Sequence, residues 1–375
     1  MKLSRVQLKW WFASVGVAAL AACGGGGDSG PAPAPAPGPT AQSYAATNLI
    51  SDVNASSNPY ATSNVDAHLV NAWGVAFNPN GYVWVANAGT SSSTLYDGNG
   101  VMQSLIVDIP AGAAGSANPT GIVFNSSTDF VVSQAGLSGA SPFIFVGEAG
   151  TLSAWSPGVS LNAAITVFDG AAAGTVYKGL ALASSAGANF LFATDFHNAR
   201  IDTFSATFAK VTTAGGFTDP TLPAGYAPFG AQAIGGQVYV SFAKQDATAH
   251  DNVNGAGLGL IDVFDTTGHF VKRLVDVGGA LNSPWGMALA PANFGPFSNA
   301  LLVGNFGDGK INAFDASTGA LLGTLSKADG TAVTVTGLWG IAFGNGLNSQ
   351  PTNTLFFAAG PANETHGVYG RIDVH

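Results

Sequence analysis

Cysteine is nearly absent from this 375-residue sequence, which contains only Cys23. With no second thiol, no disulfide can form within the chain. The stability of the folded part must therefore come from a packed core, and 47% apolar residues over this length are enough to bury a large one.

Charged residues are also scarce, at 9% of the chain, and acids outnumber bases by 21 to 12. The net charge of −9 becomes −12 when residues 1–22 are removed, because Lys2, Arg5 and Lys9 are lost and no acid is. This sign argues against nucleic acid as a partner. It also argues against electrostatic docking on anionic lipid head groups.

Several catalytic motifs are missing. The chain has no HExxH, no CxxC and no phosphate-binding glycine loop, and no Gly-x-Ser-x-Gly stands at a strand-to-helix turn. Glutamate is represented only by Glu148 and Glu364, so a metal site would depend mainly on aspartate and asparagine. No reaction is identified by these patterns.

A continuous apolar segment at the N-terminus extends from Trp10 to Leu20 and follows three cations. It is too short to span a bilayer and is typical of a secretion signal. Residues 20–23, Leu-Ala-Ala-Cys, resemble the lipobox of bacterial lipoproteins, which implies cleavage before Cys23 and diacylation of its sulfur. The alternative is an ordinary secretory signal with an incidental cysteine.

The next segment, residues 23–43, reads as a linker with no fold of its own, because it is rich in glycine and then alternates proline with alanine. Gly24 follows the cysteine where aspartate would signal retention, and by resemblance to Gram-negative sorting rules this indicates the outer membrane. We therefore expect a signal peptide over 1–22, a lipid-anchored linker over 23–43 and one folded domain over 44–375.

Six internal repeats organise that domain. Each begins with a turn and a glycine that opens an apolar strand, and the glycines are Gly74, Gly121, Gly179, Gly230, Gly286 and Gly340. A period near 50 residues with several short strands per unit is typical of a propeller blade. The sequence therefore predicts an all-β fold, a six-bladed β-propeller of four-stranded blades.

The second strand of each unit is a nearly continuous apolar run, as in 83–86 and 355–358, which predicts burial on both faces. The third strand alternates polar and apolar residues, as in 200–205 and 260–265, which predicts half-burial. The last unit ends with its third strand at residues 371–375. Residues 44–53 resemble the fourth strands, so we expect the N-terminal strand to complete the last blade. Seven blades would need one more repeat, and none is left.

In a propeller, the turns before the inner strands and the loops after the second strands open on one face around the central channel, and ligand sites gather there. This places Trp73, Trp285, Trp339 and Lys178 at that face, with His366 from a later loop, as candidate ligand-binding residues. The alternative for the tryptophans is packing between blades, because buried indoles are normally part of the core.

Asp195, Asn305 and Asn87 each follow a second strand and are candidate ligands for a divalent cation such as Ca²⁺. The alternative is that these side chains cap turns. His197 is a candidate acid or base, because imidazole titrates near neutral pH, although loop histidines are usually surface residues.

The motifs at 282–286, 304–314 and 337–346 resemble an uncharacterised family of exported bacterial propellers, and more distantly the NHL-repeat and gluconolactonase-like propellers. The resemblance implies the fold and leaves the function open. The linker, the loops without a catalytic motif and the low charge favour a binding or scaffold module for a small molecule, a glycan or a protein. The alternative is a metal-assisted hydrolase or lyase, lactonase-like, at the channel mouth. The metal-binding glutamate expected near the first blade of a lactonase is not found.

Overall fold

A computed structural model describes residues 42–54 and 58–375, where nearly all regular structure is β-strand. The predicted signal peptide, Cys23 and most of the linker lie outside the described residues. Within the described part, no helix is long and apolar enough to cross a membrane. Three short 3₁₀ helices are present, Ala88–Thr90, Ala171–Ala173 and Gly295–Phe297.

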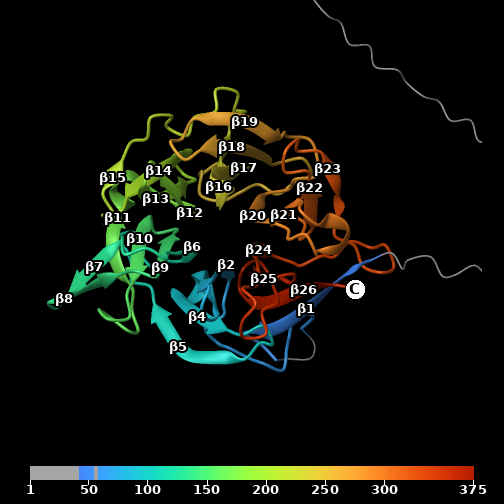
Figure 1. Cartoon of the computed structure of the whole chain (residues 1–375), viewed down its shortest axis with the longest axis horizontal. Coiled ribbons are helices and arrows are strands. Elements are labelled where there is room, and N and C mark those ends of the chain that lie inside the picture. The colour runs from blue at the N-terminus through green and yellow to red at the C-terminus, as the bar shows by residue number, and fades with distance from the viewer. Residues whose placement is uncertain (1–41, 55–57) are drawn as a thin grey trace, which may run out of the picture. The chain divides into compact units, whose positions relative to one another are not determined.

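Six four-stranded antiparallel sheets lie around a central axis, which confirms the six-bladed propeller (Figure 1). From the inside outward, the first three blades are β2 (Ala72–Phe77), β3 (Val83–Asn87), β4 (Ser92–Tyr96), β5 (Met102–Asp108); β6 (Pro119–Phe124), β9 (Phe143–Gly147), β10 (Thr151–Trp155), β11 (Ile165–Asp169); and β12 (Tyr177–Ser185), β13 (Ala188–Asp195), β14 (Arg200–Ser205), β15 (Lys210–Val211).

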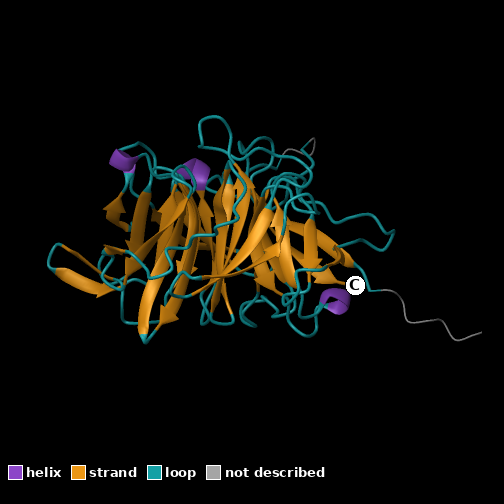
Figure 2. Ribbon diagram, turned by 90° about the horizontal axis from the view of Figure 1, so that it is seen from above, coloured by secondary structure: helices purple, strands orange, loops and turns teal. Residues whose placement is uncertain are grey.

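The other three blades follow the same order. They are β16 (Tyr226–Ile234), β17 (Gln237–Lys244), β18 (Leu260–Asp265), β19 (Phe270–Val275); β20 (Pro284–Leu289), β21 (Leu301–Asn305), β22 (Ile311–Phe314), β23 (Leu321–Thr324); and β24 (Leu338–Phe343), β25 (Leu355–Ala359), β26 (Val368–Val374), β1 (Tyr44–Ser51). The blades stand side by side, with loops at both ends of the strands (Figure 2).

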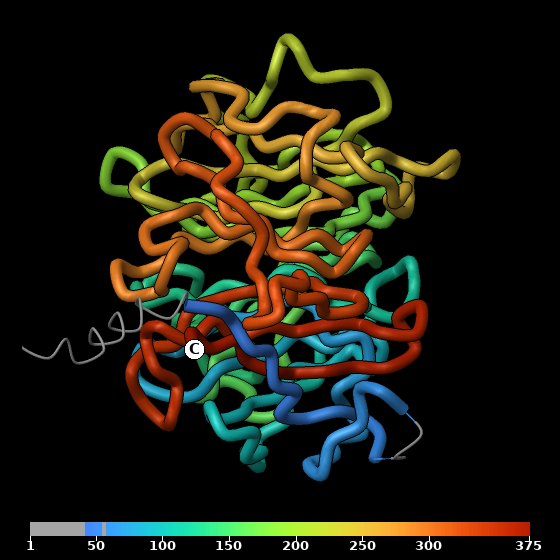
Figure 3. The backbone as a smooth tube through the Cα atoms, turned by 90° about the vertical axis from the view of Figure 1, so that its right-hand side faces the viewer, coloured from blue at the N-terminus to red at the C-terminus, as the bar shows by residue number. Residues whose placement is uncertain are grey.

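The N-terminal strand closes the ring as the sequence predicts. β1 pairs antiparallel with β26, and Tyr44 lies opposite Val374 (Figure 3). Tyr44 and Ile50 are buried in this blade, and the Tyr44 hydroxyl donates a 2.9 Å hydrogen bond to the carbonyl of Phe294 in the neighbouring blade. This strand therefore joins the first and last segments of the propeller in one sheet.

The six repeated glycines lie where neighbouring inner strands approach each other. A Cβ atom on Gly340 would stand 2.6 Å from the carbonyl oxygen of Trp73, and one on Gly286 would stand 2.5 Å from that of Trp339. Real Cβ atoms do not approach so closely, so the repeat needs glycine for close backbone contact.

The residue just before the inner strand is left-handed in several blades. Asn71, Asn118 and Ser283 have φ of 47°, 44° and 48°, and glycine takes the corresponding place at Gly225 and Gly337. Because the conformation recurs, it belongs to the blade architecture and is not a local strain at one site.

One sequence prediction needs correction. Half-burial holds for Arg200–Ser205, but the other third strands, such as Leu260–Asp265, are mostly or fully buried, and the polar residues Asp202, Asp262 and Asn312 lie inside. Each is bonded to a basic or polar side chain of the same blade, which makes burial possible.

Blade 2 also contains an unpredicted hairpin, β7 (Val131–Gln134) and β8 (Leu137–Ala140), which projects from the rim (Figure 1). It lies between the first and second strands of that blade, and it explains the wide spacing between Gly121 and Gly179.

Candidate functional site

The inner strands all begin at one end of the central axis, here called the upper mouth, and an aromatic cluster blocks the channel there. This aromatic plug consists of Trp73, Phe196, Phe229, Trp285, Phe306 and Trp339. Trp339 is its centre, stacked on Trp73 with ring centroids 3.7 Å apart and on Phe306 at 3.9 Å. Trp73 and Trp339 are each 1% exposed. Packing, the alternative considered from the sequence, therefore describes these two rings.

Hydrogen bonds fix two of the three indoles. Trp285 donates through Nε1 to the carbonyl of Lys178 at 2.9 Å, and Trp339 donates to Oδ1 of Asn71 at 3.2 Å. The indole nitrogen of Trp73 is buried and has no partner among the described residues. Trp285 is only partly buried, so it is the one predicted aromatic ligand that keeps some exposure.

Lys178, the second residue of the inner strand β12, lies against the plug and is 1% exposed. Its ammonium nitrogen is 5.4 Å from the centroid of Trp73. It pairs with the carboxylate of Glu148 and, at 3.2 Å, with that of Asp251. A buried cation needs such partners, because an unpaired ammonium would pay a large desolvation cost.

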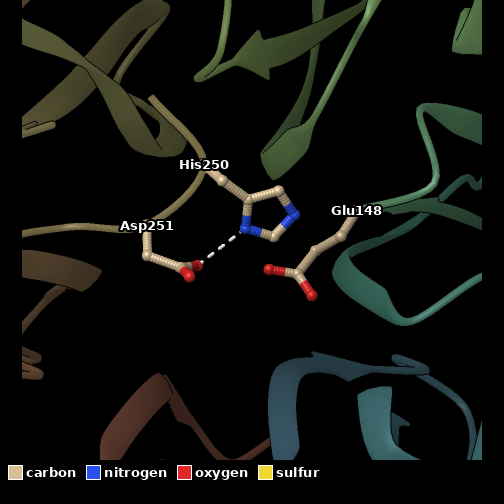
Figure 4. Close-up of side chains that lie close together, drawn as sticks. All are labelled: Glu148, His250 and Asp251. Carbon is tan, nitrogen blue, oxygen red and sulfur yellow. Dashed lines mark hydrogen bonds and ion pairs between the residues drawn. The ribbon is translucent and has the colours of Figure 1, made fainter. Parts of the chain in front are cut away.

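Glu148, His250 and Asp251 form a compact group of possible metal-ligating atoms around this lysine. One donor atom from each lies within 4.8 Å of the others. Figure 4 shows the carboxylate of Glu148 directed toward the ring of His250, whose Nδ1 is 3.0 Å from Asp251 Oδ1. The side chains of His250 and Asp251 are 46% and 65% exposed, so this group faces solvent.

Glu364 supplies a further carboxylate at the same mouth. Its Oε2 accepts a 2.7 Å hydrogen bond from Nδ2 of Asn71. It ends a run of three left-handed residues, Ala362, Asn363 and Glu364, with φ of 54°, 53° and 65°. No corresponding run occurs in another described blade, so this strained turn is particular to the site.

The ionisation of the group follows from these contacts. Burial alone would lower the pKa of Lys178, but the charges of Glu148 and Asp251 outweigh it and raise the pKa. The hydrogen bond from His250 holds the pKa of Asp251 well below its usual range, and the same bond raises the pKa of His250. Burial raises the pKa of Glu364. At neutral pH the lysine is therefore charged and cannot act as a base.

A cleft of about 260 Å³ adjoins the group, and Glu148 and His250 line it together with Asn118 and Gly174. His197 is exposed, and its ring would be 3.4 Å from a side chain added at Gly174. The predicted acid or base therefore lies at the edge of the cleft, and not among the charged residues.

The three predicted metal ligands each make hydrogen bonds to residues near them and not to one another. Asp195 is fully buried; its Oδ2 accepts from Asn198 at 2.8 Å and pairs with Arg200 at 3.1 Å. The amides of Asn87 and Asn305 donate to Thr94 and to the carbonyl of Ala280. In residues 42–54 and 58–375 no hydrogen bond or ion pair joins the three. Only Asp195 accepts from backbone N–H groups, those of Val176 and Asn198, as the turn-capping alternative expects. The Oδ1 atoms of Asn87 and Asn305 are buried and have no partner among the described residues.

His366 lies farther out, against the closing strand. Its Nδ1 is 2.7 Å from Asp52 Oδ2, and its ring packs 5.4 Å from that of Tyr60. The structure does not bring it into contact with Lys178 or with the aromatic plug.

Sequence reasoning missed Asn71, His250 and Asp251 and gave Glu148 no place at the mouth. His250 and Asp251 lie in the long loop between β17 and β18, which follows no repeat. One signal was present: the chain has only two glutamates, and both lie at the upper mouth.

The fold and this site define a six-bladed β-propeller with a charged upper mouth. Solved propellers share the fold at low identity. A streptogramin B lyase has a TM-score of 0.50 at 12% identity, over 89% of this chain and 98% of its own. An aldose sugar dehydrogenase from Escherichia coli has 0.50 at 11%, over 88% and 99%. A protein of unknown function from Bacteroides thetaiotaomicron has 0.54 at 10%, over 89% and 76%.

No family model matches the chain. One uncharacterised protein of Acanthamoeba polyphaga mimivirus is 32% identical over 318 residues, which cover 83% of this chain and 76% of the relative. A second from the same virus is 31% identical over 319 residues, covering 82% and 81%. The chain belongs to the family of these mimivirus proteins. These relatives are viral, whereas the sequence resemblance pointed to exported bacterial propellers.

Proposed function

We propose that this protein is a membrane-anchored binding propeller that captures a positively charged group of its ligand at the upper mouth. One observation carries the proposal. Side chains from several blades meet at the axis, and their only ammonium, Lys178, is 1% exposed, whereas the carboxylate side chain of Asp251 is 65% exposed. Above the raised pKa of His250, whose side chain is also exposed here, the surface offered to solvent is therefore acidic, with Glu148 beside Asp251 and Glu364 at the same mouth.

An ammonium or guanidinium group suits this surface. Carboxylates bind such cations through charge-assisted hydrogen bonds, and guanidinium binds them in bidentate geometry. The cleft beside Glu148 and His250 gives room for the body of a ligand. The ligand itself, whether a small molecule, a glycan or a protein side chain, is defined here only by this positive charge.

A thermal scan of the full chain with N-acetyl-argininamide tests the proposal, with neutral N-acetyl-citrullinamide as the matched control. A ligand that binds the native state raises the melting temperature by mass action. We expect a rise with the cationic compound only, and no rise in Glu148→Gln/Asp251→Asn. Equal responses to the two compounds, or no response to either, would reject capture of a cation.

Anchoring rests on the lipobox-like Leu20 to Cys23 and on the linker that follows. By this proposal the protein is exported and held at the outer membrane by acyl chains on Cys23, at the periplasmic face or the cell surface. Cell fractionation of Cys23→Ala tests it. The variant should leave the membrane fraction, and a variant that still partitions like the wild type contradicts the anchor.

A metal-assisted hydrolase or lyase is the second candidate, favoured by the close donor atoms of Glu148, His250 and Asp251. One imidazole and two carboxylates suit a divalent metal that polarises a substrate or activates water. His197 at the cleft edge would then serve as acid or base. Lys178 already bonds both carboxylates, and for this reason we rank the binding module first.

Elemental analysis of the purified chain, with thermal scans in the presence and absence of chelator, separates the two candidates. A stoichiometric metal that is lost in Asp251→Asn would favour the enzyme. Absence of metal, with no effect of chelator, would favour the binding module.

A further inference from the structure

The opposite end of the axis, here called the lower mouth, is hollow. The cavity there has a volume of about 470 Å³ and is lined by three consecutive residues from each of the six inner strands. In β2 these are Val75 to Phe77, the end of the strand, whereas the aromatic plug lies at its beginning. The two mouths are therefore separate sites at opposite ends of one channel.

The lining of the lower mouth carries no charge. Seventeen of its residues are apolar, and the only polar side chain is that of Gln232. A charged ligand would lose its hydration there without gaining a partner of opposite charge, which is costly. The cavity volume lies in the range of small-molecule pockets, which are mostly apolar with few polar groups.

The inner end of the cavity is closed, and its walls offer hydrogen bonds. A small hollow of about 30 Å³ continues it as far as Trp285. Each inner strand is the last strand of its sheet, so one backbone edge faces the channel without a ladder partner. Such an edge presents N–H and C=O groups, which can bond a neutral polar group of a ligand.

Blade 4 has the smallest side chains at two positions of the lining. Counting from the repeated glycine, the third residue is Phe77, Phe124 or Phe343 in three blades but Ala233 in blade 4. The first residue after the glycine is likewise alanine only in this blade, at Ala231. The wall at β16 thus combines two small side chains with the exposed amide of Gln232 between them.

From this geometry we propose that the lower mouth binds an uncharged small molecule with an apolar body, seated beside Ala233 with its inner end toward Trp285. The site does not depend on the cation site at the upper mouth, because the plug separates them.

Fluorescence titration of the full chain carrying Cys23→Ser, which removes any acyl chain, tests the proposal. The probe is N-phenyl-1-naphthylamine, which is neutral, and the comparison probe is the anionic 1-anilinonaphthalene-8-sulfonate. We expect saturable binding of one neutral probe per chain and at least tenfold weaker binding of the anion. Equal binding of the two probes, or no saturable binding of the neutral one, overturns the proposal.

Variants locate the bound probe. Ala233→Phe places in blade 4 the residue that three other blades already carry, so it should fold, and we expect it to weaken binding of the neutral probe at least tenfold. Gln232→Glu should weaken it as well, by adding a charge. Leu137→Phe, at an exposed position of the β7–β8 hairpin, is the control and should leave binding unchanged. Unchanged affinity in both Ala233→Phe and Gln232→Glu contradicts the site.

Discussion

Two buried ion networks of this propeller can be compared, one at the outer part of the blades and one at the axis. In the outer network Arg273 pairs with Asp219, with Asp262 at 2.5 Å and with Asp276 at 2.9 Å. Third strands of other blades carry similar pairs, such as Arg371 with Asp373. At the axis, Lys178 pairs with Glu148 and Asp251, and no other described blade repeats this arrangement.

The comparison separates architecture from candidate function. A contact that recurs from blade to blade compensates a polar residue that the repeat buries everywhere, so it is explained by the fold. A contact that occurs once, where residues from several blades meet, has no such explanation. By this criterion the group around Lys178 is the candidate site. Asp195, Asn87 and Asn305 share one position of the repeat but make different contacts, and a metal site there stays a prediction.

Deleting residues 1–53 should have the largest effect on stability, because it removes β1, the strand that completes the last blade and closes the ring. Burial of Tyr44 and Ile50 alone contributes roughly 1.5–3 kcal/mol each, and the free edge of β26 would add to the loss. We expect the truncated chain to fail to fold or to melt far below the wild type. Deletion of residues 1–42 is the control, and equal melting temperatures for the two truncations reject closure by β1.

Lys178→Met tests how much the ion network at the axis contributes to stability. It leaves Glu148 and Asp251 without their cation, and losing one partner of a buried pair costs roughly 3 kcal/mol. Lys210→Met is the control. Lys210 is 38% exposed, and its buried partner Asp202 keeps a second cation, Arg200 at 3.0 Å, so we expect a smaller loss. Urea unfolding measures the free energy of unfolding of both variants. Equal decreases would show that the axial ion pair contributes no more to stability than the pair at the rim.

Gly340→Ala tests the close contact between inner strands. The added Cβ would stand 2.6 Å from the carbonyl oxygen of Trp73, and overpacking of this kind costs about 1–3 kcal/mol. Gly158→Ala is the matched control, because a Cβ there meets nothing within 4 Å. Thermal unfolding should show a loss for the first and almost none for the second. A tolerated Gly340→Ala would mean that the repeated glycine is not required by packing.

The outer network predicts a pH dependence. Burial raises the pKa of Asp262 to about 7, and the negative charge of Asp219 adds to this rise. The hydrogen bond and charge of Arg273 act in the opposite direction but are outweighed. An acid whose pKa is higher in the folded state stays protonated while the unfolded chain ionises. Stability from this residue is therefore lost as pH rises from about 4 to 7, at no more than about 1.4 kcal/mol per pH unit.

Asp262→Asn should remove that loss, and the fold accepts asparagine there, since Asn312 has the corresponding place in blade 5. The measurement is the difference between wild-type and variant melting temperatures across pH 4–7. Parallel curves would show that Asp262 is ionised throughout this range.

The features that could be predicted from the sequence are those that recur from blade to blade. Gly74 and its five repeats predict the blades, and residues 44–53 predict the closing strand, because both depend on local patterns that recur. The buried third strands were missed, since the alternation in 260–265 resembles a half-exposed strand when the partner Arg273 is not considered.

The upper mouth could not be predicted from any local pattern. Lys178 meets Glu148 and Asp251 across 30 and 73 residues of sequence, and only the packing of blades 2, 3 and 4 around the axis brings them together. The hairpin β7–β8 also hides the strand that ends before Glu148, because it interrupts the repeat of blade 2.

Calorimetric titration of the full chain with N-acetyl-argininamide tests most directly whether the unrepeated group at the axis is a ligand site. The account predicts one binding site per chain, with at least tenfold weaker binding in Glu148→Gln/Asp251→Asn. Asp315→Asn, an exposed turn position remote in the repeat from the mouth, should bind like the wild type. The same affinity in all three proteins, or no binding to the wild type, would contradict it.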